Sequence, residues 1–225
     1  MYEQVSHALL NETLDRLDPE IRRQDLRHFY TRLGANFYAI YSLFHHLYGD
    51  REDFTRQLTR LIEVMASQYI ERAPVLRQSD IEREKDHNWF LRQEWVGMAL
   101  YVDGFAGDLQ GLRENLSYLQ ELGINMVHVM PILECPQGAS DGGYAVSDFR
   151  NVDSRVGTMD DVRELADVMR QRQMLLTLDV VVNHTSNQPL WAESARAGDQ
   201  RYQDYYYTFE NRDVPDMFEE TMPEV

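Results

Sequence analysis

The sequence has a single cysteine and no long apolar run, and each shortage excludes a class of protein. Cys135 is the only cysteine among 225 residues, so no disulfide can form within the chain. No stretch of about 18 apolar residues occurs, so we expect no transmembrane span. Residues 1–4 lack the basic and apolar regions that begin a signal peptide. We therefore expect a cytoplasmic protein, although secretion by another route is compatible with this sequence.

Basic residues are also scarce. The chain has 22 Lys and Arg against 38 Asp and Glu, which gives a formal net charge of −16. Such a surface repels phosphate backbones and anionic lipid, so we expect neither nucleic acid nor a membrane as a partner. A neutral substrate such as a sugar is unaffected. Apolar residues make up 43% of the chain, enough for a buried core.

The first part of the chain has a helical pattern. Over residues 25–48 apolar residues recur at three- and four-residue steps, which predicts one amphipathic helix. A second run of this kind covers residues 53–70, and Pro74 follows it. Residues 77–88 are highly charged, and we expect a solvated linker or helix there. A helical domain over residues 1–90 is the prediction.

Beyond residue 90 short apolar runs alternate with helical segments. Three nearly continuous runs have the pattern of parallel strands buried on both faces: residues 95–102, 125–132 and 174–182. Helices are predicted between them, over residues 108–123 and 158–172. Thr158 is a candidate N-cap of the second helix, because acidic residues follow it in the first turn. This order predicts an α/β fold with parallel strands and right-handed crossovers.

The third apolar run leads directly into polar side chains. Residues 178–184 read Leu-Asp-Val-Val-Val-Asn-His. Polar groups at the carboxyl end of a parallel strand face the site region in α/β folds, so Asp179, Asn183 and His184 are candidate site residues. The alternative is a buried structural acid followed by a turn.

A glycine-rich segment after the second run is the other candidate. Gly142 and Gly143 permit a tight turn with positive φ, which would present Asp141 and Tyr144 to the same space. A carboxylate can bond two sugar hydroxyls, and an aromatic face can stack on a pyranose ring. The alternative is an Asx-type turn with a packed tyrosine.

These segments resemble the α-amylase family, glycoside hydrolase family 13. Residues 179–184 are similar to its first conserved region, in which an Asp precedes Asn-His. Residues 135–147 contain Cys-Pro-x-Gly-x-Ser-Asp-Gly-Gly-Tyr-Ala-Val-Ser and look like the loop after the second barrel strand of the amylosucrase subgroup. Residues 95–108 are similar to the first barrel strand and loop of that subgroup. The resemblance covers nearly the whole chain and is firmest over residues 90–207.

The resemblance implies an all-helical N-terminal domain over residues 1–90 and a partial catalytic barrel over residues 91–184. The partial barrel would hold the first three βα units of a TIM (β/α)8 barrel, and residues 185–225 would begin a loop-rich B domain. A closed barrel needs about 250 residues. Only about 130 residues follow Trp95, so we expect an incomplete barrel and an incomplete sequence. A small complete α/β domain with a helical cap is the other possibility.

For the whole enzyme, the resemblance implies transfer of glucose from sucrose to an α-1,4-glucan with release of fructose. The mechanism would be a retaining double displacement that uses two carboxylates. In the family these groups follow the fourth and fifth barrel strands, and no Gly-Phe-Arg-x-Asp-like segment follows His184. We therefore predict that the nucleophile and the acid/base lie beyond Val225 and that this chain alone is inactive.

Matched residue by residue, Asp141, Tyr144 and His184 would line the glucosyl subsite. Tyr144 would be the stacking platform, Asp141 would bond hydroxyls, and His184 would bond the 6-hydroxyl. Asp179 and Asn183 would support the site. We predict no cofactor and no metal, because amylosucrases generally lack the calcium site to which the residue matching Asn183 contributes in many amylases. The alternatives are a sucrose hydrolase or another α-amylase-family glycosidase, and a non-catalytic sugar-binding or interaction module.

Overall fold

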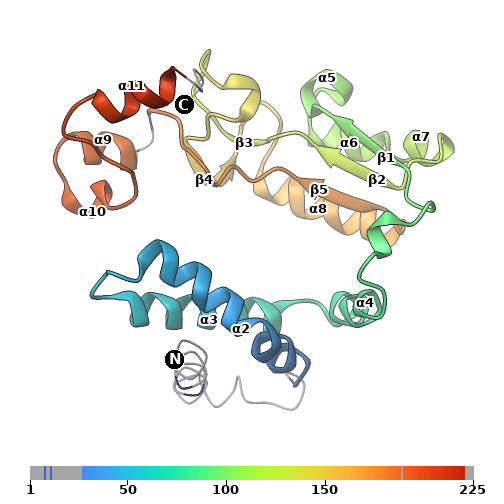
Figure 1. The fold of residues 1–225 in the computed structure, drawn as a ribbon. Coiled ribbons are helices and arrows are strands. Elements are labelled where there is room, and N and C mark those ends of the chain that lie inside the picture. Colours follow the sequence, from blue (N-terminus) through green and yellow to red (C-terminus); the bar gives the residue numbers. More distant parts are fainter. Residues whose placement is uncertain (1–7, 9–10, 12–26, 189, 221–225) are drawn as a thin grey trace. The chain divides into compact units, whose positions relative to one another are not determined.

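The computed structural model describes residue 8, residue 11 and residues 27–188 and 190–220 (Figure 1). The chain divides into two compact units, Met1–Trp89 and Phe90–Val225. The predicted start of the first helix at residue 25 and the end of the predicted B domain, residues 221–225, lie outside the described residues. None of the described helices is both long and apolar enough to cross a membrane.

Helices build the described part of the first unit: α2 (Arg27–Tyr48), α3 (Phe54–Glu71) and α4 (Pro74–Glu84). The apolar stripes of α2 and α3 meet in one buried cluster of Phe29, Leu33, Phe37, Tyr41, Leu58, Ile62 and Ala66. Pro74 occupies the first position of α4, where its missing N–H costs nothing. The charged segment is therefore a helix as far as Glu84. Arg72 contacts Asp80 of this helix at 2.7 Å.

Three parallel strands form the sheet of the second unit: β1 (Gly97–Leu100), β2 (Met126–Val129) and β5 (Leu175–Leu178). Their order is β1-β2-β5, so β2 lies in the centre (Figure 1). The predicted fold class is confirmed: a helical part precedes a partial parallel sheet of the kind that starts a (β/α)8 barrel, and the described strands do not close into a barrel.

Helices cover one face of this sheet. They are α5 (Val102–Ala106), α6 (Leu109–Glu114), α7 (Leu116–Glu121) and α8 (Met159–Gln171). Val127 and Val129 of β2 are fully buried against leucines of α6 and α7 and against Leu165 and Met169 of α8. Gly97, Ala99 and Thr177 point to the other face and are exposed. The predicted burial of both strand faces is therefore wrong for these residues, because the helices pack on one side only.

The sequence predicted one detail of the crossover helices wrongly and one correctly. The helix expected over residues 108–123 is interrupted at Asn115, whose side-chain amide donates to the Gly111 carbonyl at 2.8 Å. The N-cap at Thr158 is confirmed. Its hydroxyl oxygen accepts from the backbone N–H of Asp161 at 3.2 Å, and the Asp161 carboxylate accepts from the backbone N–H of Thr158 at 2.8 Å.

Irregular segments follow β2 and β5. The first contains an antiparallel pair, β3 (Leu133–Glu134) and β4 (Asp148–Val152), with a 3-10 turn over Asp141–Gly143 between them. The second carries three short helices, α9 (Leu190–Arg196), α10 (Gln200–Gln203) and α11 (Asp213–Glu219). Its assignment to a B domain stays a prediction.

Candidate functional site

The carboxyl ends of the three strands bring polar side chains to one edge of the sheet. His128 of β2 pairs with Thr177 of β5, so the two side chains lie on the same face. Asp179 comes two residues after Thr177, and side chains alternate along a strand. The Asp179 side chain therefore points to the face that carries His128, which is the face without helices.

Asp179 uses both of its carboxylate oxygens. Nε2 of His128 lies 2.9 Å from Oδ1, and the Tyr144 hydroxyl donates to Oδ2 at 3.2 Å. Because a carboxylate accepts, the bond from His128 requires the imidazole proton on Nε2. Burial raises the pKa of Tyr144, and the bond to Asp179 and its negative charge raise it further. The phenol therefore stays protonated and keeps donating at neutral pH.

The glycine-rich loop adopts the predicted positive φ angles. Gly142 has φ of 64° and Gly143 has φ of 94°. Asp141 also has a positive φ, 47°, which the sequence did not predict. A Cβ atom on Gly143 would lie 2.8 Å from the carbonyl oxygen of Pro131, which is closer than real contacts allow. The loop therefore lies directly against the segment after β2, and this close approach places Tyr144.

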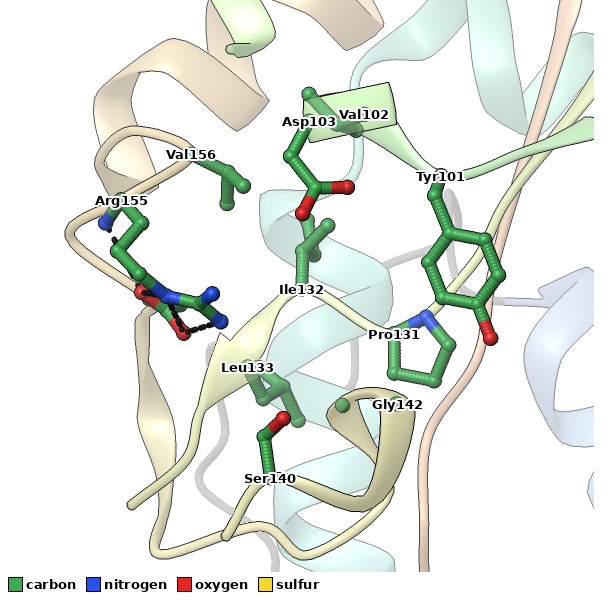
Figure 2. A pocket seen from close by; sticks show the side chains of 12 residues that line it. Tyr101, Val102, Asp103, Pro131, Ile132, Leu133, Ser140, Gly142, Arg155 and Val156 are labelled. Atoms are coloured by element: carbon green, nitrogen blue, oxygen red, sulfur yellow. Dashed lines mark hydrogen bonds and ion pairs between the residues drawn. The ribbon is translucent and has the colours of Figure 1, made fainter. Parts of the chain in front are cut away.

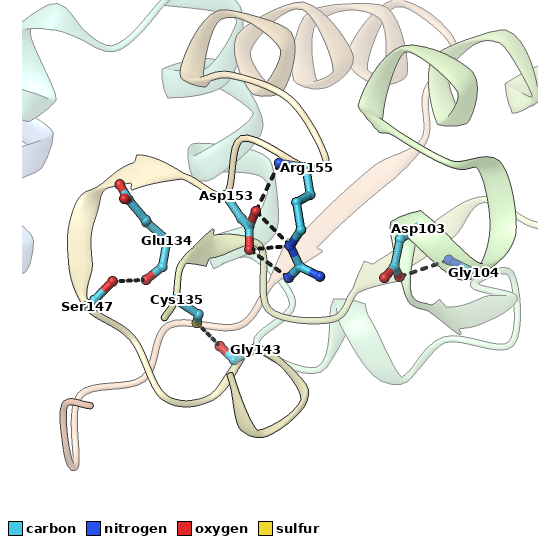
Figure 3. Close-up of polar contacts among 8 residues, drawn as sticks. All are labelled: Asp103, Gly104, Glu134, Cys135, Gly143, Ser147, Asp153 and Arg155. Carbon is cyan, nitrogen blue, oxygen red and sulfur yellow. Dashed lines mark hydrogen bonds and ion pairs between the residues drawn. The ribbon is translucent and has the colours of Figure 1, made fainter. Parts of the chain in front are cut away.

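Hydrogen bonds hold the loop at its two ends (Figure 3). The Cys135 thiol donates to the Gly143 carbonyl at 3.3 Å. The backbone N–H and the hydroxyl of Ser147 both donate to the Glu134 carbonyl, at 2.8 Å and 3.0 Å. Burial, with a smaller effect of the Asp153 charge, raises the pKa of the Cys135 thiol, so the thiol keeps the proton that it donates.

A cavity of about 250 Å³ lies beside this loop (Figure 2). Its lining combines apolar residues with hydroxyl, carboxylate and guanidinium groups: Tyr101, Val102, Asp103, Pro131, Ile132, Leu133, Ser140, Gly142, Gly143, Asp153, Arg155 and Val156. The Arg155 guanidinium contacts the buried Asp153 carboxylate at 2.7 Å, and Figure 3 shows the pair. This contact lowers the pKa of Asp153 although burial opposes the shift.

The predicted site residues fall into two groups. Tyr144 and Asp179 are half-buried and bonded to each other, while Asp141 is exposed on the loop before Tyr144. Asn183 and His184 are both exposed, and Nδ2 of Asn183 lies 3.4 Å from Nδ1 of His184. Among the described residues, no hydrogen bond joins His184 to Asp141 or Tyr144, and no three His, Cys, Asp or Glu side chains gather as a metal site would require.

A backbone bond brings the two groups into one region. The N–H of Ser186, two residues after His184, donates to the carbonyl of Val146, two residues after Tyr144, at 2.8 Å. Ser186 is buried, so this contact is protected from water. The segment with His184 therefore runs beside the glycine-rich loop.

Sequence reasoning missed two residues of this region. His128 is the polar side chain within the second apolar run, and a period-two reading of that run places it on the face opposite Val127 and Val129. Tyr101 follows β1, and a Cβ on Gly142 would lie 3.3 Å from its hydroxyl oxygen. Both residues lie at or near the carboxyl end of a strand, and this position could have marked them as candidate site residues.

Comparison with known proteins gives the family. Residues 41–224 match the alpha-amylase family, described as "Alpha amylase, catalytic domain", and this span is most of the chain. The chain belongs to the α-amylase family. The family resemblance predicted from Asp179 to His184 is thereby confirmed.

Relatives of this α-amylase family member act on several sugars, by their names. An oligo-1,6-glucosidase of Bacillus sp. (strain F5) is 42% identical over 106 residues, which are 47% of this chain and 20% of the relative. The trehalose synthase/amylase TreS of Mycobacterium tuberculosis (strain ATCC 25618 / H37Rv) is 42% identical over 127 residues, 54% of this chain and 21% of the relative. The chain thus spans about a fifth of the length of these curated relatives.

Among solved structures, the trehalulose synthase MutB from Pseudomonas mesoacidophila MX-45 is 37% identical with a TM-score of 0.48. The match covers 54% of this chain and 23% of that chain.

Proposed function

We propose that this chain supplies part of the glucosyl-binding wall of an amylosucrase, an enzyme that takes glucose from sucrose and adds it to an α-1,4-glucan. The observation that carries the proposal is the hydrogen bond from Tyr144 to Asp179 at 3.2 Å. This bond fixes the hydroxyl end of a half-buried aromatic ring at the carboxyl edge of the sheet. A ring held in this way needs little further ordering when a pyranose stacks on it.

Asp141 fits the role of a hydroxyl acceptor. Its side chain is exposed, and among the described residues none bonds its carboxylate. The turn at Gly142 and Gly143 keeps Asp141 close to Tyr144 in space, because the backbone N–H of Tyr144 donates to the Asp141 carbonyl at 3.1 Å. A carboxylate beside an aromatic face can bond hydroxyls of a sugar that the ring holds.

The choice of sucrose rests on the loop sequence. Residues 135–147 resemble the amylosucrase subgroup in particular, whereas the family match gives only the α-amylase level. In the whole enzyme the reaction would be a retaining double displacement with a covalent glucosyl intermediate. We place the two catalytic carboxylates outside this chain, His184 at the 6-hydroxyl of the bound glucosyl ring, and Asn183 in support.

The experiment that tests this function uses the full-length protein that carries this chain. The protein is incubated with sucrose and an α-glucan primer, and fructose, glucose and glucan are measured by chromatography. We expect fructose release together with elongation of the primer. Equal amounts of glucose and fructose without elongation would instead identify a sucrose hydrolase. Hydrolysis of α-1,6-linked oligosaccharides without sucrose consumption would identify an oligo-1,6-glucosidase, and no turnover of any sugar would favour a binding module.

Two variants connect the activity to this site. Tyr144→Ala removes the proposed platform and should raise KM for sucrose strongly. Tyr118→Ala removes an exposed tyrosine of α7 and should leave KM unchanged. The 225-residue chain alone should release no fructose, and measurable release would contradict our placement of the carboxylates.

A further inference from the structure

Asp179 has a second partner whose role the proposed sugar platform does not explain. Nε2 of His128 lies 2.9 Å from Oδ1 of Asp179, although 51 residues separate the two in sequence. We propose that His128 is a positioning residue, which holds Asp179 in the orientation that accepts the Tyr144 hydroxyl and thereby fixes the Tyr144 ring. The inference rests on the proposed function in one respect, namely that Tyr144 is the platform for the glucosyl ring.

The pairing of the strands brings the two residues together. In the sheet, His128 lies between Ala99 of β1 and Thr177 of β5. These three side chains share the face opposite the helices, and Asp179 continues that face beyond the end of β5. Ala99 is small, so it leaves room for the imidazole ring beside it. The contact is thus set by the backbone register of the central strand against β5, and Asp179 is the first residue after the end of β5.

Each carboxylate oxygen of Asp179 has its own hydrogen-bond partner. The terminal torsion of an aspartate side chain is broad, so a carboxylate held by one hydrogen bond alone can rotate. His128 bonds Oδ1, which defines the plane of the carboxylate, and Oδ2 then faces the Tyr144 hydroxyl at 3.2 Å. Without His128, Asp179 would rotate and the bond to Tyr144 would be made only part of the time.

This role predicts a specific kinetic signature. The platform contacts the sugar in the ground state and in the transition state alike, so loosening it raises KM and leaves kcat nearly unchanged. For His128→Ala we expect KM for sucrose to rise about tenfold, the factor that corresponds to one hydrogen bond of ordinary strength. His128→Gln keeps an N–H donor of similar reach and should restore most of the loss. Thr177→Ala is the matched control, because Thr177 is the neighbour of His128 on the same sheet face.

A double-mutant cycle separates positioning from a general structural role. Tyr144→Phe keeps the ring but removes the hydroxyl that bonds Asp179. If His128 acts through that bond, adding His128→Ala to Tyr144→Phe changes KM by less than about twofold. If the two single effects multiply instead, His128 does not act through Tyr144 and the proposal is wrong.

A measurement without sugar keeps this test independent of the proposed function. The full-length protein is labelled with [13Cζ]tyrosine, and the Tyr144 resonance is assigned by its loss in Tyr144→Phe. We expect His128→Ala to shift this resonance and His128→Gln and Thr177→Ala to leave it in place. An unmoved resonance in His128→Ala would overturn the positioning role. If the resonance moves but sucrose is not turned over, the proposed function fails and the positioning role stands.

The folded state of each variant is checked by thermal unfolding. If His128→Ala does not fold, His128→Asn replaces it in all three measurements. Asparagine is too short to span the distance to Asp179 but keeps a polar group on this face of the sheet.

Discussion

The Tyr144 hydroxyl donates a hydrogen bond to Oδ2 of Asp179 at 3.2 Å, and this contact spans 35 residues of the sequence. It joins the glycine-rich loop after β2 to the end of β5. The two segments were separate candidates in the sequence, and the bond joins them in one candidate site. It also gives the phenol an unusual setting, because a negative charge lies next to a partly buried hydroxyl.

Replacing Asp179 by asparagine should lower the pKa of Tyr144. Asp179→Asn removes the negative charge that opposes ionisation of the phenol, while the amide carbonyl can still accept its hydrogen bond. The pKa should stay above the ordinary value of a tyrosine, because burial is the largest cause of the shift and is unchanged. A pH titration of the Tyr144 resonance in [13Cζ]tyrosine-labelled protein measures this. An unchanged titration in Asp179→Asn would show that the Asp179 charge does not reach the phenol.

Gly143 should be far less tolerant of a side chain than Gly138. Both residues have positive φ, 94° and 71°, so alanine is strained at either position. At Gly143 the new Cβ would also lie 2.8 Å from the Pro131 carbonyl oxygen, whereas at Gly138 nothing lies within 4 Å. We expect Gly138→Ala to lower the free energy of unfolding by about 1 kcal/mol and Gly143→Ala by about 2–3 kcal/mol.

Urea unfolding of the two glycine variants measures the difference in their free energies of unfolding. The KM for sucrose of the full-length protein reports whether the loop has shifted. On the proposed function, Gly143→Ala should also raise KM for sucrose, because the shifted loop carries Tyr144. Equal destabilisation by the two substitutions would mean that the close approach to Pro131 does not constrain the loop.

Much of the fold follows from local patterns in the sequence. The apolar stripe over residues 25–48 is typical of one long helix, and α2 covers Arg27–Tyr48. The three apolar runs became β1, β2 and β5 in parallel order, because short apolar segments between helices favour that arrangement. The positive φ of Gly142 and Gly143 follows from the conformational freedom of paired glycines.

Contacts between distant segments could not be predicted in this way. The bond between His128 and Asp179 depends on which residues of β2 and β5 are neighbours, and no local pattern specifies that register. The break at Asn115 arises because its side chain competes for a backbone carbonyl within an otherwise continuous leucine stripe. Apolar runs also do not tell which strand face the helices cover, so the exposure of Ala99 was missed.

Loss of the Thr158 cap should weaken α8. The Thr158 hydroxyl oxygen accepts from the Asp161 N–H, and Asp161 accepts from the Thr158 N–H in return. Thr158→Ala should lower the free energy of unfolding by about 1 kcal/mol. Thr158→Ser keeps the hydroxyl and should lower it by only about 0.3 kcal/mol. Urea unfolding of the three proteins tests this, and equal stability of the alanine and serine variants would contradict the cap.

The pairing of Asp153 and Arg155 should make the free energy of unfolding depend on pH under acidic conditions. Asp153 is only 8% exposed, and it accepts from the Arg155 backbone N–H at 2.9 Å and from its guanidinium at 2.7 Å. These bonds lower the pKa of Asp153 below its ordinary value of 3.8. The contribution to stability is therefore complete above the unfolded-state pKa and is lost as the pH falls through the lower folded-state value.

Replacing Asp153 by asparagine should remove this dependence together with part of the stability. Asp153→Asn keeps an oxygen for the Arg155 N–H but loses the charge that holds the guanidinium. Because the Arg155 side chain is 59% exposed, solvent screens the pair, and we expect a loss of about 1 kcal/mol at pH 7. The difference between the native protein and Asp153→Asn should begin to shrink as the pH falls below about 4, where Asp153 of the unfolded chain takes up a proton, and should vanish once the pH is below the lower folded-state pKa. Urea unfolding from pH 7 to pH 2.5 measures it, with Arg155→Ala as a control that should show the same loss at pH 7. A difference that stays constant over this range would mean that the charge of Asp153 does not contribute to folding.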